Sequence, residues 1–227
     1  MNILEAQWLG QRIAGVPAAD LGPIINLGSS TAHYRAVEQP HIDELIFGPC
    51  KARHVTVYHV DLKSAPGVDL VGDVLDPAFA EKLSGLNPRS VIISNLLEHV
   101  IDPSSICRTS LSLLPAGGYL FISGPKDYPY HADPIDTMFR PTIAELHQLL
   151  PGTRIVDSAI VDSGNWRRWN AHERGRSLRR TLMRLLIPFW RPTHWWMLVR
   201  QTPYLLKHIT AFAMMLEKLP GSSSEER

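Results

Sequence analysis

Seven short apolar runs, each followed by polar or turn-forming residues, constrain this fold more than any other feature of the chain. Such runs are typical of strands, and segments with helical patterning lie between several of them. Short apolar strands that alternate with helices indicate a parallel sheet covered on both faces. We therefore expect an α/β, doubly wound, mostly parallel seven-stranded sheet of the Rossmann-like type. The expected strands are residues 23–28, 54–61, 67–73, 90–95, 117–125, 153–162 and 208–218, the last of which could equally be a helix.

Three segments have the features of helices. Residues 3–14 carry apolar side chains near helical spacing. Residues 76–86 and 102–114 each begin with an aspartate followed by a proline, a pair that suits a helix start with proline at its first position. The chain has 227 residues, of which 44% are apolar and 20% charged, so it can bury a sizeable core. We expect residues 1–227 to form a single domain.

The cysteines and the lengths of the apolar runs indicate the cellular compartment. Cys50 and Cys107 lack the spacing of metal ligands and do not make a disulfide framework, so we expect a reducing cytoplasm and no metal site. The first fifteen residues lack a basic region followed by an apolar core, so no secretory signal is expected. No apolar run approaches the roughly 20 residues that span a bilayer.

Residues 165–207 form a basic, tryptophan-rich segment before the last expected strand. The segment contains ten lysines and arginines and one acidic residue, so its net charge is +9. Because the net charge of the whole chain is +1, the rest of the chain carries −8. Five of the six tryptophans also lie in this segment. Apolar residues between Leu178 and Phe189 follow helical spacing, and arginines occupy the other side. We expect a helical insertion.

Several roles are open for this insertion. A basic amphipathic helix with aromatic residues suits an anionic membrane surface, which would make the protein peripheral at the inner face of the membrane. A lid or a homodimer surface with solvated arginines is an equal alternative. Nucleic acid ranks lower, because the basic patch is confined to one apolar insertion. A polyanionic or lipid-linked substrate would account for both the charge and the apolar face.

Candidate binding residues follow successive strands. In open α/β sheets the ligand lies outside the carboxyl ends of the strands. Taken singly, these residues are typical of ordinary turns and caps. Their order along successive strand ends favours a ligand site, because a solvated surface has no reason to place them so. They are Gly28, Ser29 and Ser30 after the first strand, Asp61 after the second, Asp73 after the third and Asn95 after the fourth.

Together these residues resemble the class I S-adenosylmethionine-dependent methyltransferases. The strongest match is "VIISNLLEHVIDPSSICRTSLSLLPAGGYLFISGP", residues 91–125, and the resemblance covers roughly residues 20–165. In the first motif the family's acid position holds Asn26, and its second and third glycine positions hold Ser30 and Ala32. The expectation is S-adenosylmethionine-dependent methyl transfer, with oxygen as the acceptor atom. The alternative is a degenerate fold that serves as a non-catalytic binding, regulatory or membrane-surface module.

The resemblance implies which residues meet the cofactor, S-adenosyl-L-methionine. The loop after the first strand would hold the methionine moiety, the second strand's end the ribose and the third strand's end the adenine. Asn95 would lie beneath the sulfonium. The implied cofactor-binding residues are Asn26, Gly28, Ser29, Ser30, Asp61, Leu62, Asp73, Val74 and Asn95.

The acceptor side is expected in the loop after the fifth strand, which resembles a substrate loop of enzymes that act on glycans or small molecules. A hydroxyl acceptor needs a base near pH 7, which suits a histidine. His131 is the first candidate and His99 the second; a loop histidine and a packed histidine are the alternatives. Glu98, taken singly, is expected on a solvated face. Candidate substrate-binding residues are Asp133, Asp136 and Arg140, and "ADPID" is also ordinary turn chemistry.

Overall fold

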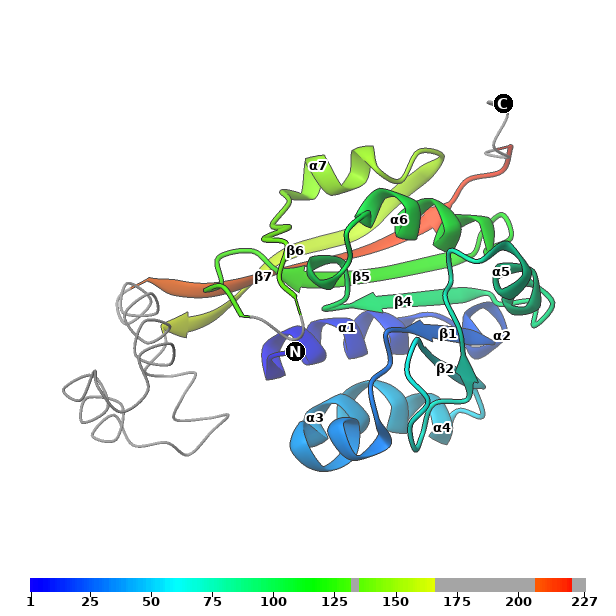
Figure 1. Ribbon diagram of the computed structural model, residues 1–227, viewed down its shortest axis with the longest axis horizontal. Coiled ribbons are helices and arrows are strands. Elements are labelled where there is room, and N and C mark those ends of the chain that lie inside the picture. Colours follow the sequence, from blue (N-terminus) through cyan, green and yellow to red (C-terminus); the bar gives the residue numbers. More distant parts are fainter. Residues whose placement is uncertain (132–134, 166–206, 222–227) are drawn as a thin grey trace.

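The computed structural model describes residues 1–131, 135–165 and 207–221, and these form one seven-stranded sheet with helices on both faces (Figure 1). The strand order is β3-β2-β1-β4-β5-β7-β6. Neighbours from β3 to β5 pair in parallel, and β7 runs antiparallel to both β5 and β6. The expected doubly wound α/β fold is confirmed. The strands are β1 (Ile24–Leu27), β2 (Val57–Asp61), β3 (Leu70–Val71), β4 (Ser90–Ser94), β5 (Tyr119–Pro125), β6 (Thr153–Asn165) and β7 (His208–Lys218).

The winding direction changes between β1 and β4. From β1 the chain builds outward through β2 to β3, then crosses back to β4 and builds the other half of the sheet. The carboxyl ends of β1 and β4 therefore border the topological switch point, which is where ligands bind in open α/β sheets.

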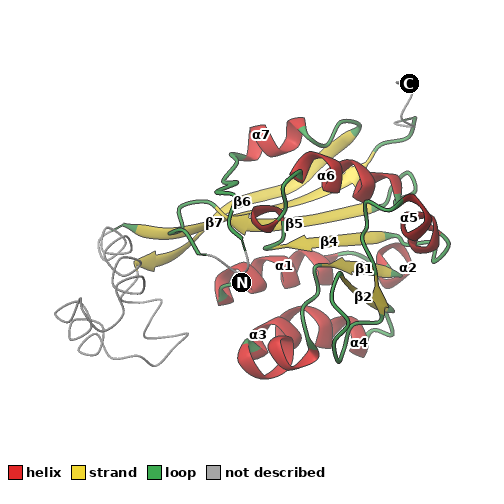
Figure 2. Ribbon diagram, viewed as in Figure 1, coloured by secondary structure: helices red, strands yellow, loops and turns green. Residues whose placement is uncertain are grey.

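Helices cover both faces of this sheet (Figure 2), and a hydrophobic core lies on each face. Successive strand residues point to opposite faces, so Ile25 and Val91 enter one core while Ile24 and Ile92 enter the other. The first core packs on α5, α6 and α7, and the second on α1, η2 and α4. The helices are α1 (Ile3–Gly15), α2 (Ala18–Leu21), η1 (Tyr34–Glu38), α3 (Pro40–Ile42), η2 (Asp43–Phe47), α4 (Gly48–Ala52), α5 (Pro77–Ser84), η3 (Leu97–His99), α6 (Pro103–Ser112) and α7 (Ile143–Gln148).

Most local expectations agree with the structure. Asp76 and Asp102 cap α5 and α6, accepting hydrogen bonds from the amides of Ala78 at 3.2 Å and Ser105 at 3.0 Å. Residues 208–218 form a strand rather than a helix, because their backbone pairs with β5 on one side and β6 on the other. The third strand is only two residues long, and β6 extends three residues past its expected end.

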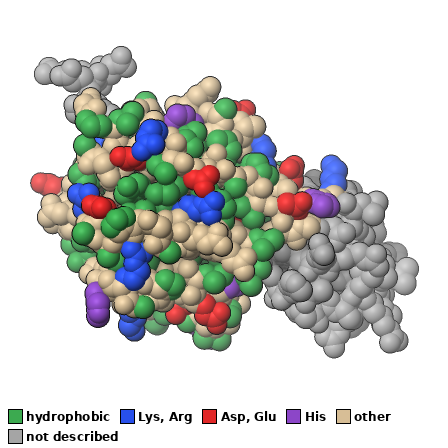
Figure 3. Space-filling model, turned by 180° about the vertical axis from the view of Figure 1, so that it is seen from behind, with side chains coloured by type: hydrophobic (Ala, Val, Ile, Leu, Met, Phe, Trp, Pro, Cys, Tyr) green, Lys and Arg blue, Asp and Glu red, His purple; other side chains and the backbone are tan. Residues whose placement is uncertain are grey.

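The predicted insertion joins the paired ends of β6 and β7. Its residues 166–206 lie outside the described residues, whereas Asn165 pairs with His208 across the two strands. Because Ala211 of β7 pairs with Pro125 at the end of β5, the insertion starts from the carboxyl edge of the parallel strands. Its roles as lid, dimer surface or membrane contact stay predictions. Among the described helices, none has the length and apolar character that crossing a membrane requires. On the face opposite to Figure 1, acidic and basic side chains are interspersed (Figure 3).

Gly10 permits the close approach of α1 to η2. A Cβ there would lie 2.2 Å from the carbonyl oxygen of Leu45, which is backbone and has little freedom to move. Gly10→Ala gains about 1 kcal/mol of helix propensity, but overpacking costs about 1–3 kcal/mol or more. We expect the free energy of unfolding, measured in urea, to fall by about 1–2 kcal/mol. Gly15→Ala, at the end of the same helix with open space around it, is the matched control; equal effects of the two changes would contradict this prediction.

Candidate functional site

The sheet order places the predicted residues in one row. Asp73 follows β3, Asp61 ends β2, Gly28 follows β1 and Asn95 follows β4, and these strands are consecutive neighbours. A row spanning the switch point is what an extended ligand across the carboxyl edge requires.

The loop after β1 is held in an unusual conformation. Gly28 and Ser30 have φ of +67° and +55°, in the left-handed region that residues other than glycine rarely adopt. Ser29 is buried, and its hydroxyl donates to the Ser30 carbonyl at 3.2 Å. Leu96 lies against the Gly28 α-carbon, since a Cβ there would be 2.8 Å from Leu96 Cδ1.

Arg35 of η1 holds this loop in place through hydrogen bonds to its backbone. It is 6% exposed, and its Nη1 donates to the carbonyls of Ser29 and Ser30, both at 2.8 Å. Its Nη2 donates to the Gly67 carbonyl at 2.8 Å, in the loop that follows β2. One guanidinium therefore ties together the two loops expected to hold the methionine and the ribose.

The side chain of Asn26, at the position expected to hold an acid, forms a hydrogen bond within the sheet. Its Nδ2 lies 3.1 Å from Nδ1 of His59 on the neighbouring strand. Burial, with the nearby Arg35 charge, lowers the pKa of His59 to about 4, so the ring is neutral and its Nδ1 can accept from the amide. An acid at position 26 could not donate to His59 Nδ1, because an ionised carboxylate only accepts hydrogen bonds.

Asp61 and Asp73 remain open to a ligand. The Asp61 carboxylate accepts from the Ser30 amide at 2.9 Å and the Lys63 amide at 3.1 Å, one bond to each oxygen. Asp73 is exposed and accepts from the Leu75 amide at 2.9 Å. Each carboxylate oxygen has two lone pairs, so both acids keep acceptor capacity. Beside them Leu62 is 68% exposed and Val74 is buried.

Asn95 lies at the end of β4, where α1 reaches the site. Its φ is +49°, and its Nδ2 donates to Oε1 of Glu5 at 2.7 Å. Glu5 is 1% exposed and also accepts from the Asn2 amide, so α1 contributes a buried acid to the site.

Glu98 is buried, and its expected place on a solvated face is wrong. The residue is 1% exposed, and within the described residues neither carboxylate oxygen accepts a hydrogen bond. Burial raises the pKa of Glu98 to about 7, partly offset by the neighbouring His99. The loop after β5 covers it, because Thr137 donates to the Glu98 carbonyl from its amide at 2.9 Å and from its hydroxyl at 3.1 Å.

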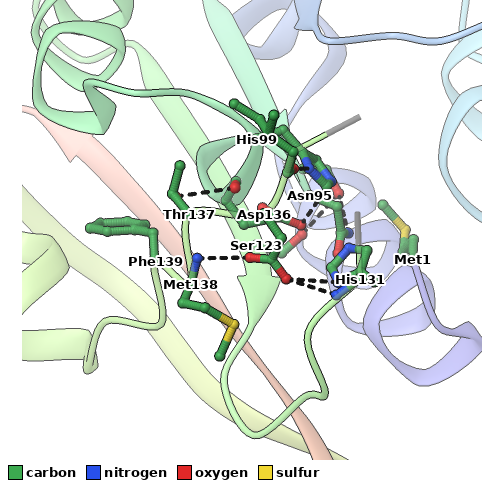
Figure 4. Close-up of polar contacts among 12 residues, drawn as sticks. Met1, Asn95, His99, Ser123, His131, Asp136, Thr137, Met138 and Phe139 are labelled. Atoms are coloured by element: carbon green, nitrogen blue, oxygen red, sulfur yellow. Dashed lines mark hydrogen bonds and ion pairs between the residues drawn. The ribbon is translucent and has the colours of Figure 1, made fainter. Parts of the chain in front are cut away.

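Figure 4 shows the two candidate histidines, His99 and His131. Together with Glu98 they form one cluster. The ring centroids of His99 and His131 are 5.2 Å apart, edge to face. Nδ1 of His99 lies 2.5 Å from the Ile135 carbonyl, and Nδ1 of His131 lies 3.2 Å from Oδ2 of Asp136. Burial lowers the pKa of His131, against the opposing charge of Asp136.

Asp136 and Arg140 are paired with each other. Arg140 Nη2 lies 2.7 Å from Asp136 Oδ2, and the Asp136 side chain also accepts from the amides of His131 and Met138. Burial acts to raise the pKa of Asp136, but these hydrogen bonds outweigh it and the pKa is lowered. Both residues thus shape the loop; their substrate roles stay predictions. Asp133 lies outside the described residues.

Sequence reasoning missed three supporting residues: Arg35, His59 and Glu5. Each forms a hydrogen bond with a residue that the sequence had indicated. A polar residue inside an otherwise apolar strand, as at His59, was the one signal available.

Comparisons with known proteins identify the fold. A putative sarcosine dimethylglycine methyltransferase from Galdieria sulphuraria is 12% identical, with a TM-score of 0.59 over 94% of this chain and 84% of that one. Coclaurine N-methyltransferase bound to N-methylheliamine and SAH is 13% identical, with a TM-score of 0.57 over 94% and 69%. A SAM-dependent methyltransferase from Archaeoglobus fulgidus is 14% identical, with a TM-score of 0.53 over 94% of both chains. The chain has the class I methyltransferase fold.

By sequence, no family model and no curated protein matches the chain. The likeness to the solved structures therefore establishes the methyltransferase fold, and the thinned glycine motif in the first loop stays a prediction.

Proposed function

We propose that this protein transfers a methyl group from S-adenosylmethionine to a hydroxyl of a small molecule or glycan. The observation that carries the proposal is the row of Asp73, Asp61, Gly28 and Asn95 across the switch point. The SAH in one structure of this fold supports the choice of cofactor.

The residues of this row fit the cofactor. Asp61 offers free lone pairs to two ribose hydroxyls, and exposed Asp73 lies beside buried Val74 at the adenine end. The backbone of Ser29 and Ser30 is already held by Arg35, so the loop is preorganised. Bound S-adenosylmethionine supplies an activated methyl group, and the protein supplies alignment and exclusion of water.

The acceptor side lies around His131 and His99. The lowered pKa of His131 keeps its ring neutral near pH 7, so a ring nitrogen can accept the proton of an acceptor hydroxyl. The Asp136 carboxylate lies 3.2 Å from Nδ1, where its charge would stabilise the protonated ring. Arg140, with Nε unpartnered among the described residues, is the group of this loop suited to a substrate anion.

Asp61→Ala tests the cofactor site. Loss of charge-assisted bonds to the ribose, each worth about 1.5–3 kcal/mol, should weaken S-adenosylmethionine binding at least about tenfold in calorimetry. Asp20→Ala is the matched control, because Asp20 is also a carboxylate at the surface but pairs with Arg89, which directly precedes β4 at its amino end. Absence of binding to the wild-type protein, or equal affinity in both variants, would overturn the proposal.

A non-catalytic member of the fold is the second candidate. Leu96 already covers the Gly28 α-carbon, and the Ser29 hydroxyl is bonded within its own loop. These contacts favour a first loop that no longer receives the methionine moiety, and the same calorimetry distinguishes the two functions.

A further inference from the structure

Glu98, His99 and His131 form a cluster of metal-ligand groups that the cofactor row does not use. Each offers one ligand atom, and these atoms all lie within 4.8 Å of one another. Zn²⁺ bonds of about 2.0–2.2 Å put neighbouring ligand atoms about 3–3.5 Å apart, so movements of about an ångström would close the cluster on an ion. The three side chains come from η3 and the loop after β5, which pack together through Thr137.

The buried carboxylate of Glu98 has no hydrogen-bond donor among the described residues. It is 1% exposed, and neither oxygen accepts a hydrogen bond from the described residues. An unpaired buried charge is costly unless it is neutralised or coordinates a cation. His99 Nε2, 3.7 Å from Glu98 Oε1, is too distant for a hydrogen bond.

His99 has the outer contact that metal ligands usually have, whereas a ring nitrogen of His131 is without a hydrogen bond among the described residues. A ligating imidazole normally offers its other ring nitrogen to a carbonyl or carboxylate, which fixes the ring. Nδ1 of His99 has such a contact, 2.5 Å from the Ile135 carbonyl, and this contact holds its ring beside Glu98. Nδ1 of His131 is buried and lies 3.2 Å from the Asp136 carboxylate without hydrogen-bond geometry, so this ring nitrogen has no hydrogen-bond partner among the described residues.

The surrounding charge also favours a cation. With Glu5 and Asp136 near the cluster, three carboxylates face one guanidinium, that of Arg140. The formal charge of these groups is −2 when all are ionised, which matches a divalent ion.

We propose that Glu98, His99 and His131 bind one divalent first-row transition-metal ion, such as Zn²⁺, Mn²⁺ or Co²⁺. Two imidazoles and one carboxylate suit these ions, whereas Mg²⁺ prefers oxygen ligands alone. Three protein ligands leave open coordination positions, and these would take an oxygen of the acceptor; this last step rests on the proposed function. In the metal-bound protein the ion would then favour the deprotonated hydroxyl in place of His131 acting as a base. The sequence expectation of no metal site considered only the cysteines.

The test is metal titration of EDTA-stripped, dialysed protein without S-adenosylmethionine. We expect one Zn²⁺ per chain by calorimetry, a rise in melting temperature with Zn²⁺, and visible absorption on addition of Co²⁺. Glu98→Gln and His131→Ala should each weaken binding about 100-fold or more, because loss of outer contacts alone costs about 10–100-fold. Mg²⁺ should produce no comparable effect.

His147→Ala is the matched control, since His147 contacts a backbone carbonyl of β6 and lies outside the cluster. It should bind Zn²⁺ as the wild-type protein does. Should Glu98→Gln fail to fold, His131→Ala decides the result. No Zn²⁺ binding by the wild-type protein, or unchanged binding in His131→Ala, overturns the proposal. Cofactor titration in EDTA tests the proposed function separately.

Discussion

Replacing Arg35 with alanine is expected to lower the free energy of unfolding by about 3 kcal/mol and to abolish measurable S-adenosylmethionine binding. The guanidinium donates to three backbone carbonyls, of Ser29, Ser30 and Gly67, and its loss leaves them without this donor. Burial lowers the pKa of Arg35, and the charges of Asp69, Asp43 and Asp61 oppose that shift, so the side chain is held as a cation beneath the loops. Urea unfolding and calorimetry measure the two effects.

Two further variants separate support of the loop from general stability. Arg35→Lys keeps the charge but cannot reproduce the planar fork, so we expect most of the binding loss to persist. Arg53→Ala is the matched control, because Arg53 also donates to backbone carbonyls, of Ile13 and Val16, away from the loops. It should lower stability and leave cofactor affinity unchanged. Wild-type affinity in folded Arg35→Ala would contradict the prediction.

Stability should fall steeply with acid because of His59. Burial lowers its pKa from 6.5 in the unfolded chain to about 4 in the folded protein, so the unfolded state binds the proton more readily. The contribution is fully present above pH 6.5 and is lost as the pH falls toward 4. A shift of this size corresponds to about 3 kcal/mol.

His59→Asn isolates this contribution, because the asparagine oxygen stands near the position of Nδ1 and can still accept from Asn26. Between pH 7.5 and 4.5, the wild-type protein should lose more unfolding free energy in urea than the variant, by about 2–3 kcal/mol. Parallel pH dependence of the two proteins would show that His59 does not titrate as described.

The sequence predicted the row at the carboxyl edge because strand ends follow from local patterns. Gly28, Asp61, Asp73 and Asn95 needed only the strand boundaries and the strand order of a doubly wound sheet.

A local sequence pattern could not predict the burial of Glu98. It depends on Thr137, 39 residues away, folding back onto the Glu98 backbone. Nothing in the spacing around Glu98 records that contact, so a solvated face was the better local prediction. Arg35 is similar, since its farthest partner, Gly67, lies 32 residues away in another loop.

The pairing of Asn165 with His208 has a consequence for how proteins of this design can diversify. The two ends of the intervening segment are held side by side by strands that complete the sheet without it. Doubling the length of such a connection costs only about 0.6 kcal/mol of closure entropy. Selection can therefore exchange or lengthen this segment at the carboxyl edge of the parallel strands, while the residues of the sheet stay as they are.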